Sequence, residues 1–132
     1  MRMTVRLDLP READSVPAVR RLLRCALAVL HVDHPSSDDL EIAIPEACTN
    51  VVRHAAGANS FEVCVDLGED RCAIDVRDDG DGFDPAAACD DAPGPNSERG
   101  RGLFLIKALA ENVRMSSAPR RGSLIHFEKS FA

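Results

Sequence analysis

Hydrophobic and polar residues alternate along several stretches of the chain, as they do in strands with one buried face. Residues 1–9, for example, have an apolar side chain at every odd position, and Pro10 follows them. Gly68-Glu69-Asp70 separates two such stretches and is typical of a β-hairpin turn. A second turn is expected around Pro119-Arg120-Arg121-Gly122. The alternation predicts strands at 1–9, 61–67, 72–78, 113–117 and 123–129.

Apolar residues spaced three and four apart predict helices elsewhere in the chain. The first helix begins at Asp14 or Ser15, either of which can cap it, and runs to about Leu30. A short apolar helix is expected at 103–110.

A longer helix is predicted between these two. Pro35 is expected to break the chain, and Ser36 with Asp39 three residues later forms a capping-box start. This helix runs to about Ala56. Pro45 lies in its middle, where it removes a backbone hydrogen bond and is expected to kink the axis.

The predicted elements give an α+β protein, a two-layer sandwich with helices on one face of a mixed, mainly antiparallel sheet. With 132 residues the chain has the size of one domain, residues 1–132. Residues 79–102 have no periodicity and are rich in Gly, Pro, Asp and Ala. A loop of this length usually has a functional reason, and we interpret it as a lid.

Composition and charge argue against several classes of function. The net charge of −6 and a pI near 5.1 argue against a direct nucleic-acid partner. No apolar run approaches the ~20 residues of a membrane span, and no signal peptide is recognised, so we expect a cytoplasmic protein without a membrane segment. The five cysteines contain no C-x-x-C pair and are expected to be reduced thiols. A zinc site built from them with His31 and His34 would fit no compact ligand set.

Three polar residues, Glu46, Asn50 and His54, recur at every fourth position of the longer helix. At about 100° per residue they form one polar stripe. A carboxylate, an amide and an imidazole on one face can supply a general base, an oxygen ligand for a hard metal ion and a hydrogen-bond donor. An ordinary solvated helix face is the alternative. The apolar stripe of the same helix consists of Leu40, Ile44, Ala47, Val51 and Ala55.

A second candidate segment, Asp78-Asp79-Gly80-Asp81-Gly82, directly follows a predicted strand. Asp78 continues the apolar phase of this strand, so its carboxylate is expected to face the helices, where it needs a hydrogen-bond donor. The exocyclic amine of a purine is such a donor, and Gly80 and Gly82 would let a flat ring approach the backbone. A plain turn rich in Asp and Gly is the alternative, since the ligand spacing of an EF-hand loop is not met.

A third candidate segment, Gly100-Arg101-Gly102-Leu103, begins the last predicted helix. Free backbone N–H groups and the helix dipole favour phosphate oxygens at such a place. Arg99 and Arg101 are either further charge for a polyphosphate or plain surface arginines. The segment is neither a Walker A loop nor a Rossmann fingerprint.

In this order, the three segments resemble the N, G1 and G2 boxes of the GHKL (Bergerat) ATP-binding fold. The boxes read Glu46 to His54, Asp78 to Gly82 and Gly100 to Leu103, and the resemblance spans nearly the whole chain. Within that superfamily, the compact size and the N-box histidine are most similar to the bacterial anti-sigma factor serine-protein kinases, the RsbW-like group.

The resemblance implies ATP and Mg²⁺ as cofactors. It makes Glu46 the general base toward a serine of a partner protein, Asn50 the Mg²⁺ ligand and Asp78 the reader of the adenine amino group. It implies a STAS-type anti-anti-sigma protein and a sigma factor as partners, and a homodimer. The remaining residues for which it implies a place at the nucleotide are His54, Gly80, Gly82, Arg99, Gly100, Arg101, Gly102 and Leu103.

Two other functions share these boxes. A nucleotide-dependent interaction module would hold ATP without transferring phosphate. A histidine-kinase-like ATPase domain is the second, although its phosphoacceptor helix needs a histidine followed by an acidic residue, and none of the four histidines is followed by one.

Overall fold

The computed structural model describes residues 1–80, 98–117 and 122–132, without the side chains of residues 98–101. Most of the predicted lid, and the predicted turn up to residue 121, lie outside the described residues. In chain order the elements are β1 (Met3–Pro10), α1 (Ser15–Val29), α2 (His34–His54), β2 (Ser60–Leu67), β3 (Arg71–Asp78), α4 (Glu98–Leu109), β4 (Glu111–Ser117) and β5 (Ser123–Ser130).

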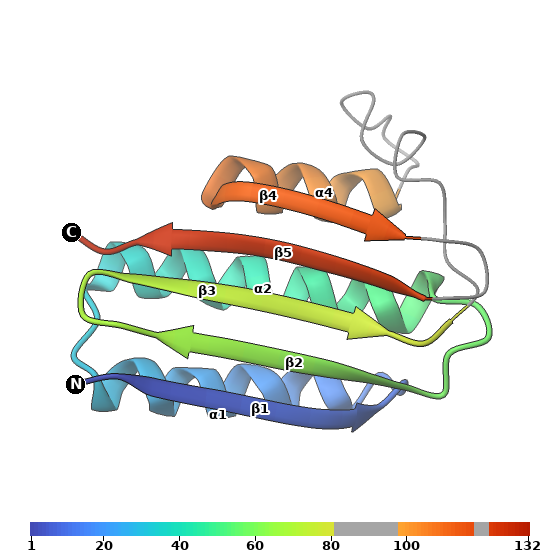
Figure 1. Ribbon diagram of the computed structural model, residues 1–132, viewed down its shortest axis with the longest axis horizontal. Helices are drawn as coiled ribbons and strands as arrows, with labels where there is room; N and C mark the ends of the chain where they lie inside the picture. The colour runs from blue at the N-terminus through green and yellow to red at the C-terminus, as the bar shows by residue number, and fades with distance from the viewer. Residues whose placement is uncertain (81–97, 118–121) are drawn as a thin grey trace.

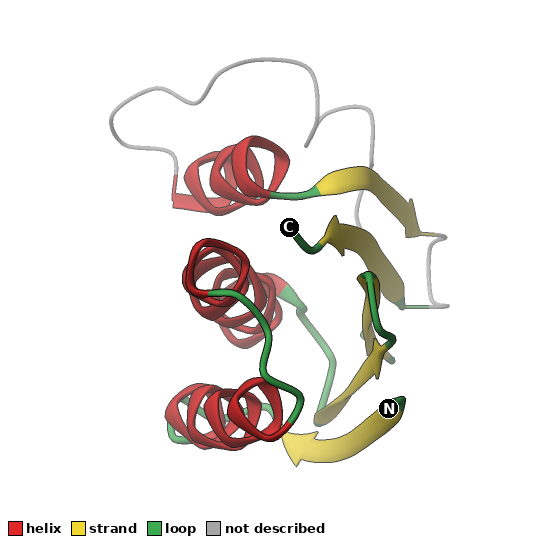
Figure 2. Cartoon of the chain, turned by 90° about the vertical axis from the view of Figure 1, so that its left-hand side faces the viewer, coloured by secondary structure: helices red, strands yellow, loops and turns green. Residues whose placement is uncertain are grey.

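The strands form one sheet in the order β1-β2-β3-β5-β4, and all four pairs in it are antiparallel. β5 therefore lies between β3 and β4 (Figure 1). Figure 2 shows that α1, α2 and α4 lie side by side against one face of this sheet. The predicted two-layer α+β architecture is confirmed. None of the helices in the described ranges is long and apolar enough to cross a membrane.

The core lies between the two layers. Val63, Val76 and Ile125 lie opposite one another across β2, β3 and β5 and are at most 4% exposed. Leu40 of α2 belongs to the same core and is 0% exposed. Asp78 occupies the next inward position of β3 after Val76, so the alternation that builds the core also places a carboxylate at its edge.

The described cysteines are free thiols, namely Cys25, Cys48, Cys64 and Cys72. Burial raises the pKa of Cys48 to about 12, and burial likewise raises the pKa of Cys72 to about 12. Neither is therefore a reactive thiolate at neutral pH.

α2 begins two residues before Ser36, its predicted start. Asp33 is the N-cap, and its Oδ2 accepts a hydrogen bond of 2.9 Å from the Ser36 backbone N–H. Pro35 lies in the first turn, where backbone N–H groups have no partner within the helix, so a proline costs no hydrogen bond there. The predicted break is therefore wrong. The helix continues through the buried Pro45 and ends at His54.

α1 begins at Ser15 as predicted, but its capping differs from the prediction, and β4 begins earlier than predicted. Asp14 is at the N-cap of α1 but makes no side-chain capping bond, whereas the Ser15 hydroxyl donates to the Pro10 carbonyl at 2.7 Å. Ser15 thus ties the start of α1 to the end of β1. β4 begins at Glu111, two residues early, and its register with β5 shifts near Asn112, whose φ is 50°.

We expect Asp33→Ala to lower the free energy of unfolding at neutral pH, and the loss to shrink in acid. The Ser36 N–H holds the pKa of Asp33 below its ordinary value of 3.8. A carboxyl with a lowered folded-state pKa contributes stability above its unfolded pKa and loses it as the pH falls through the folded value. Urea unfolding of both proteins from neutral pH to about pH 3 measures this difference. A difference that stays constant over that range would contradict the assignment of the cap.

Candidate functional site

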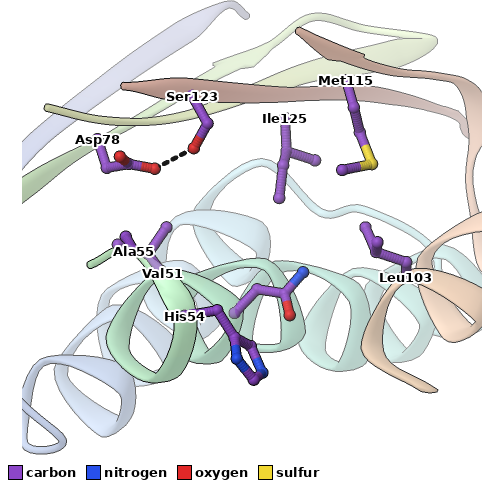
Figure 3. Close-up of a pocket in the computed structure, with 9 residues that line it drawn as sticks. Val51, His54, Ala55, Asp78, Leu103, Met115, Ser123 and Ile125 are labelled. Atoms are coloured by element: carbon purple, nitrogen blue, oxygen red, sulfur yellow. Dashed lines mark hydrogen bonds between the residues drawn. The ribbon is translucent and has the colours of Figure 1, made fainter. Parts of the chain in front are cut away.

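A recess lies where β3 ends and β5 begins, beside the last turns of α2 and the first half of α4. Figure 3 shows Val51, His54 and Ala55 on the α2 side and Asp78, Ser123, Ile125 and Met115 on the sheet side. Four predicted site residues, namely Asn50, His54, Asp78 and Leu103, therefore line one recess. The complete lining is Asn50, Val51, His54, Ala55, Asp78, Leu103, Met115, Ser123 and Ile125.

Asp78 is the buried charged group of this recess, with 5% of its surface exposed. Its Oδ1 accepts a hydrogen bond of 2.9 Å from the Gly80 backbone N–H, and its Oδ2 accepts one from the Ser123 hydroxyl. These two donors fix the carboxylate, and each oxygen retains a lone pair for a further donor. The predicted orientation of Asp78 toward the helices is confirmed. Such a carboxylate is suited to accept a hydrogen bond from an amino group in the recess.

Gly80 brings the backbone after β3 against the end of α2. A Cβ at this position would lie 2.7 Å from the Ala56 carbonyl oxygen and 3.1 Å from Asp78 Oδ1. Because real Cβ atoms do not approach a carbonyl so closely, a glycine is required here. Next to it, the side chains of Val51, Ala55 and Ile125 provide apolar surface of the kind that packs against a flat ring.

Ser123 and Gly122 are two site residues that the sequence did not predict. Both lie at the start of β5, and the antiparallel register places Ser123 opposite Asp78. Gly122 has a φ of +79°, and a Cβ there would overlap the carbonyl oxygen of Asp78. Ser123 and Gly122 therefore act together: the hydroxyl of Ser123 bonds the Asp78 carboxylate, and Gly122 allows β5 to approach the Asp78 backbone. The apolar phase of Ile125 was the one local signal that placed Ser123 on the inner face.

Replacement of Gly122 with alanine should lower the free energy of unfolding by about 2 to 4 kcal/mol, because both the positive φ and the contact with Asp78 are unfavourable for a Cβ. Gly57→Ala is the matched control, since Gly57 has a φ of 81° but is exposed. Urea unfolding of the two variants separates backbone strain from the contact. Equal losses in both would show that β5 does not depend on close approach to Asp78.

The other predicted polar residues meet at the contact between α2 and α4. A Cβ on Gly102 would lie 3.2 Å from Glu46 Oε2 and 3.7 Å from Asn50 Oδ1. Gly102 is buried, while Glu46 and Asn50 are half-buried. The glycine thus lets α4 approach the polar stripe of α2, and the stripe is not an ordinary solvated helix face. Glu46 does not line the recess of Asp78 but lies one turn along α2 from Asn50, which does.

α4 begins at Glu98, five residues before the predicted helix. Glycine has low helix propensity, so Gly100 and Gly102 concealed the first turn. Gly100 and Arg101 are within the first four residues, whose N–H groups have no partner inside a helix, but Gly102 is not. Gly82, and the side chains of Arg99 and Arg101, lie outside the described residues.

The donor set fits ATP with Mg²⁺. Asn50 offers an amide oxygen beside the recess, and the described residues contain no group of three His, Cys, Asp or Glu side chains able to hold a metal. Mg²⁺ is usually bound by one or two protein oxygens together with substrate phosphates and water. The Asn50 amide oxygen is thus an oxygen donor that such a magnesium–nucleotide complex can use.

The chain is similar in sequence to a known family and to characterised relatives. Residues 9–127 match the family described as histidine kinase-like ATPase domain. The serine-protein kinase RsbW of Bacillus velezensis is 35% identical over 128 residues, which cover 86% of this chain and 78% of the relative. RsbW of Bacillus subtilis is 32% identical with the same coverage.

Solved structures share the fold. The RsbU and RsbW domains of Rv1364c from Mycobacterium tuberculosis match with a TM-score of 0.76 and 20% identity, over 98% of this chain and 32% of that one. A blue-light activated histidine kinase from Erythrobacter litoralis EL346 matches with a TM-score of 0.55 and 20% identity, over 74% of this chain and 31% of that one.

Fold, site and family match together define an ATPase domain of the histidine kinase-like class. Within that class, the chain belongs to the RsbW family of serine-protein kinases. The family resemblance and the class of enzyme expected from the sequence are confirmed.

Proposed function

We propose that the chain binds ATP with Mg²⁺ and transfers the γ-phosphoryl group to a serine of a partner protein, in the manner of an anti-sigma factor kinase. The observation that carries this proposal is the arrangement along α2. A buried carboxylate, Asp78, lies at one end of the recess, and Glu46 meets Asn50 and Gly102 beyond its other end.

Asp78 accepts a hydrogen bond from the adenine amino group, and the Asn50 amide oxygen holds Mg²⁺. When bound, Mg²⁺ neutralises the charge of the phosphates. Glu46 accepts the proton of the serine hydroxyl as the bond from serine oxygen to γ-phosphorus forms and the bond to the leaving ADP oxygen breaks. The residues proposed to complete the nucleotide site are His54, Gly80, Gly82, Arg99, Gly100, Arg101, Gly102 and Leu103.

The proposed partners are proteins of the cytoplasm, namely a STAS-type anti-anti-sigma protein that supplies the serine and a sigma factor that the kinase holds. A homodimer is the proposed assembly. Arg20 and Arg21 are exposed on α1, where they can meet an acidic partner surface, whereas Arg24 is paired with Glu41 at 2.6 Å.

A transfer assay tests the function. The chain is incubated with Mg²⁺, ATP labelled in its γ-phosphate and a purified STAS-type anti-anti-sigma protein encoded in the same genome. The proposal predicts Mg²⁺-dependent label on one serine, located by mass spectrometry. Tight ATP binding with no label on any such protein would instead favour an interaction module that holds ATP without transfer.

Asn50→Ala is expected to weaken ATP binding about tenfold or more when Mg²⁺ is present and to leave it nearly unchanged in excess EDTA, because the proposed role of the Asn50 amide is to bind the metal. Titration calorimetry under both conditions measures this. Thr49→Ala, one position away on α2 and also half-buried, is the control. Equal weakening with and without Mg²⁺ would assign Asn50 a role in packing and not in metal binding.

A further inference from the structure

β5 carries a lysine on its core-facing side. Lys129 continues the phase of Ile125 and Phe127, which are 4% and 0% exposed. Its ammonium group donates to Asp39 Oδ2 at 2.7 Å and to the Leu109 carbonyl oxygen at 2.8 Å, and its side chain is 18% exposed. A charge in such a position is retained only with good partners. Lys129 therefore joins three elements, β5, α2 and α4, at one point.

This contact lies at the C-terminal end of α4. Leu109 is the last residue of the helix, and its carbonyl has no partner within a helix. An ammonium group satisfies this carbonyl and also interacts favourably with the negative end of the helix dipole. α4 continues into β4, an edge strand that pairs only with β5 among the described strands. Lys129 thus bonds the end of α4 directly to β5 and, through Asp39, connects it to α2.

The same two helices meet at a second point, where Gly102 lies against Glu46. Asp39 and Glu46 are seven residues apart on α2, and Gly102 and Leu109 are seven residues apart on α4. Seven residues are two helical turns, about 10 Å, so the two contacts are separated by the same length on α2 and on α4. A shift of α4 at Leu109 is therefore passed along a rigid helix to Gly102.

We propose that Lys129 is a positioning residue for phosphoryl transfer: by fixing Leu109 to Asp39, it sets how closely Gly102 lies against Glu46 and Asn50. The inference rests on the proposed function. It assigns the transfer geometry to an ion pair two turns from the reacting groups. Among the described residues, the hydrogen-bond partners of Lys129 Nζ are Asp39 and Leu109, and neither Glu46 nor Asn50 is one of them.

The test compares Lys129→Met, which retains the apolar stem, with Lys129→Arg, which retains the charge. Lys107→Met is the control, because Lys107 is the one other lysine of the chain and is exposed in the last turn of α4. Transfer to the STAS-type protein and Mg²⁺-dependent ATP binding are measured well below each melting temperature. We expect about a tenfold lower transfer rate for Lys129→Met, substantial recovery in Lys129→Arg and no change in Lys107→Met.

Asp39→Asn removes the other charge of the Lys129–Asp39 pair. This variant replaces Lys129→Met in the test if Lys129→Met does not fold. A transfer rate that is unchanged in the folded variants, with only a lower melting temperature, would overturn the proposal. If the wild type transfers no phosphate, the proposed function fails separately. In that case the Mg²⁺-dependent part of ATP binding tests the placement of Gly102 against Asn50: a weaker value in Lys129→Met supports this placement by Lys129, and an unchanged value overturns it.

Discussion

Replacing Asp78 with asparagine is expected to weaken ATP binding about a hundredfold, with and without Mg²⁺. The buried carboxylate already accepts hydrogen bonds from the Gly80 N–H and the Ser123 hydroxyl. An asparagine can satisfy both, because the serine hydroxyl is able to accept as well as donate. The amide then has fewer free lone pairs for the adenine amino group. The variant should therefore fold but bind poorly, as titration calorimetry and a thermal melt would show.

Ser123→Ala is the matched control, because it removes one donor to Asp78 and leaves the carboxylate in place. We expect a loss of affinity several times smaller than that of Asp78→Asn. Nucleotide preference gives an independent readout, since GTP has a carbonyl oxygen where ATP has its amino group. The wild type should bind ATP more tightly than GTP. If the Asp78→Asn variant bound ATP as tightly as the wild type, Asp78 would not belong to the nucleotide site.

Glu46→Gln is expected to lower the rate of phosphoryl transfer by about 10² to 10⁴ and to leave ATP affinity nearly unchanged. Glutamine has the size of glutamate but cannot take the proton of the serine hydroxyl. Because Gly102 lies so close to Glu46 Oε2, a substitution of equal size is needed to keep α4 in place. Single-turnover transfer with labelled ATP measures the rate, and calorimetry measures the affinity.

Glu41→Gln provides the control for this variant. Glu41 lies on the same helix and is half-buried like Glu46, but it pairs with the exposed Arg24, so its loss should change neither rate nor affinity. If Glu46→Gln transferred phosphate at the wild-type rate, Glu46 would not be the base. A parallel loss of ATP binding would instead indicate that Glu46 acts in holding the nucleotide.

The elements that the sequence predicted well are those whose pattern reflects burial. Val63 and Val76 alternate with polar neighbours because one face of the sheet meets the helices, and the same alternation placed Asp78 inward. The polar stripe of Glu46, Asn50 and His54 followed from helical periodicity alone. In each case the signal is local, within one strand or one helix.

The features that the sequence did not reveal depend on contacts between distant segments or on exceptions to local preference. Ser123 bonds Asp78 only because β5 pairs with β3, 45 positions away in the chain. Pro35 by itself predicts a break, although a proline suits the first turn of a helix. The start of α4 was concealed by Gly100 and Gly102, whose low helix propensity is overcome by packing against α2.

The most direct test of the account is a crystal structure of the chain with Mg²⁺ and a non-hydrolysable ATP analogue. We expect the adenine amino group within hydrogen-bonding distance of Asp78, Mg²⁺ on the amide oxygen of Asn50, and the γ-phosphate at the side of α2 that carries Glu46. A nucleotide bound elsewhere, or an adenine that faces away from Asp78, would contradict it.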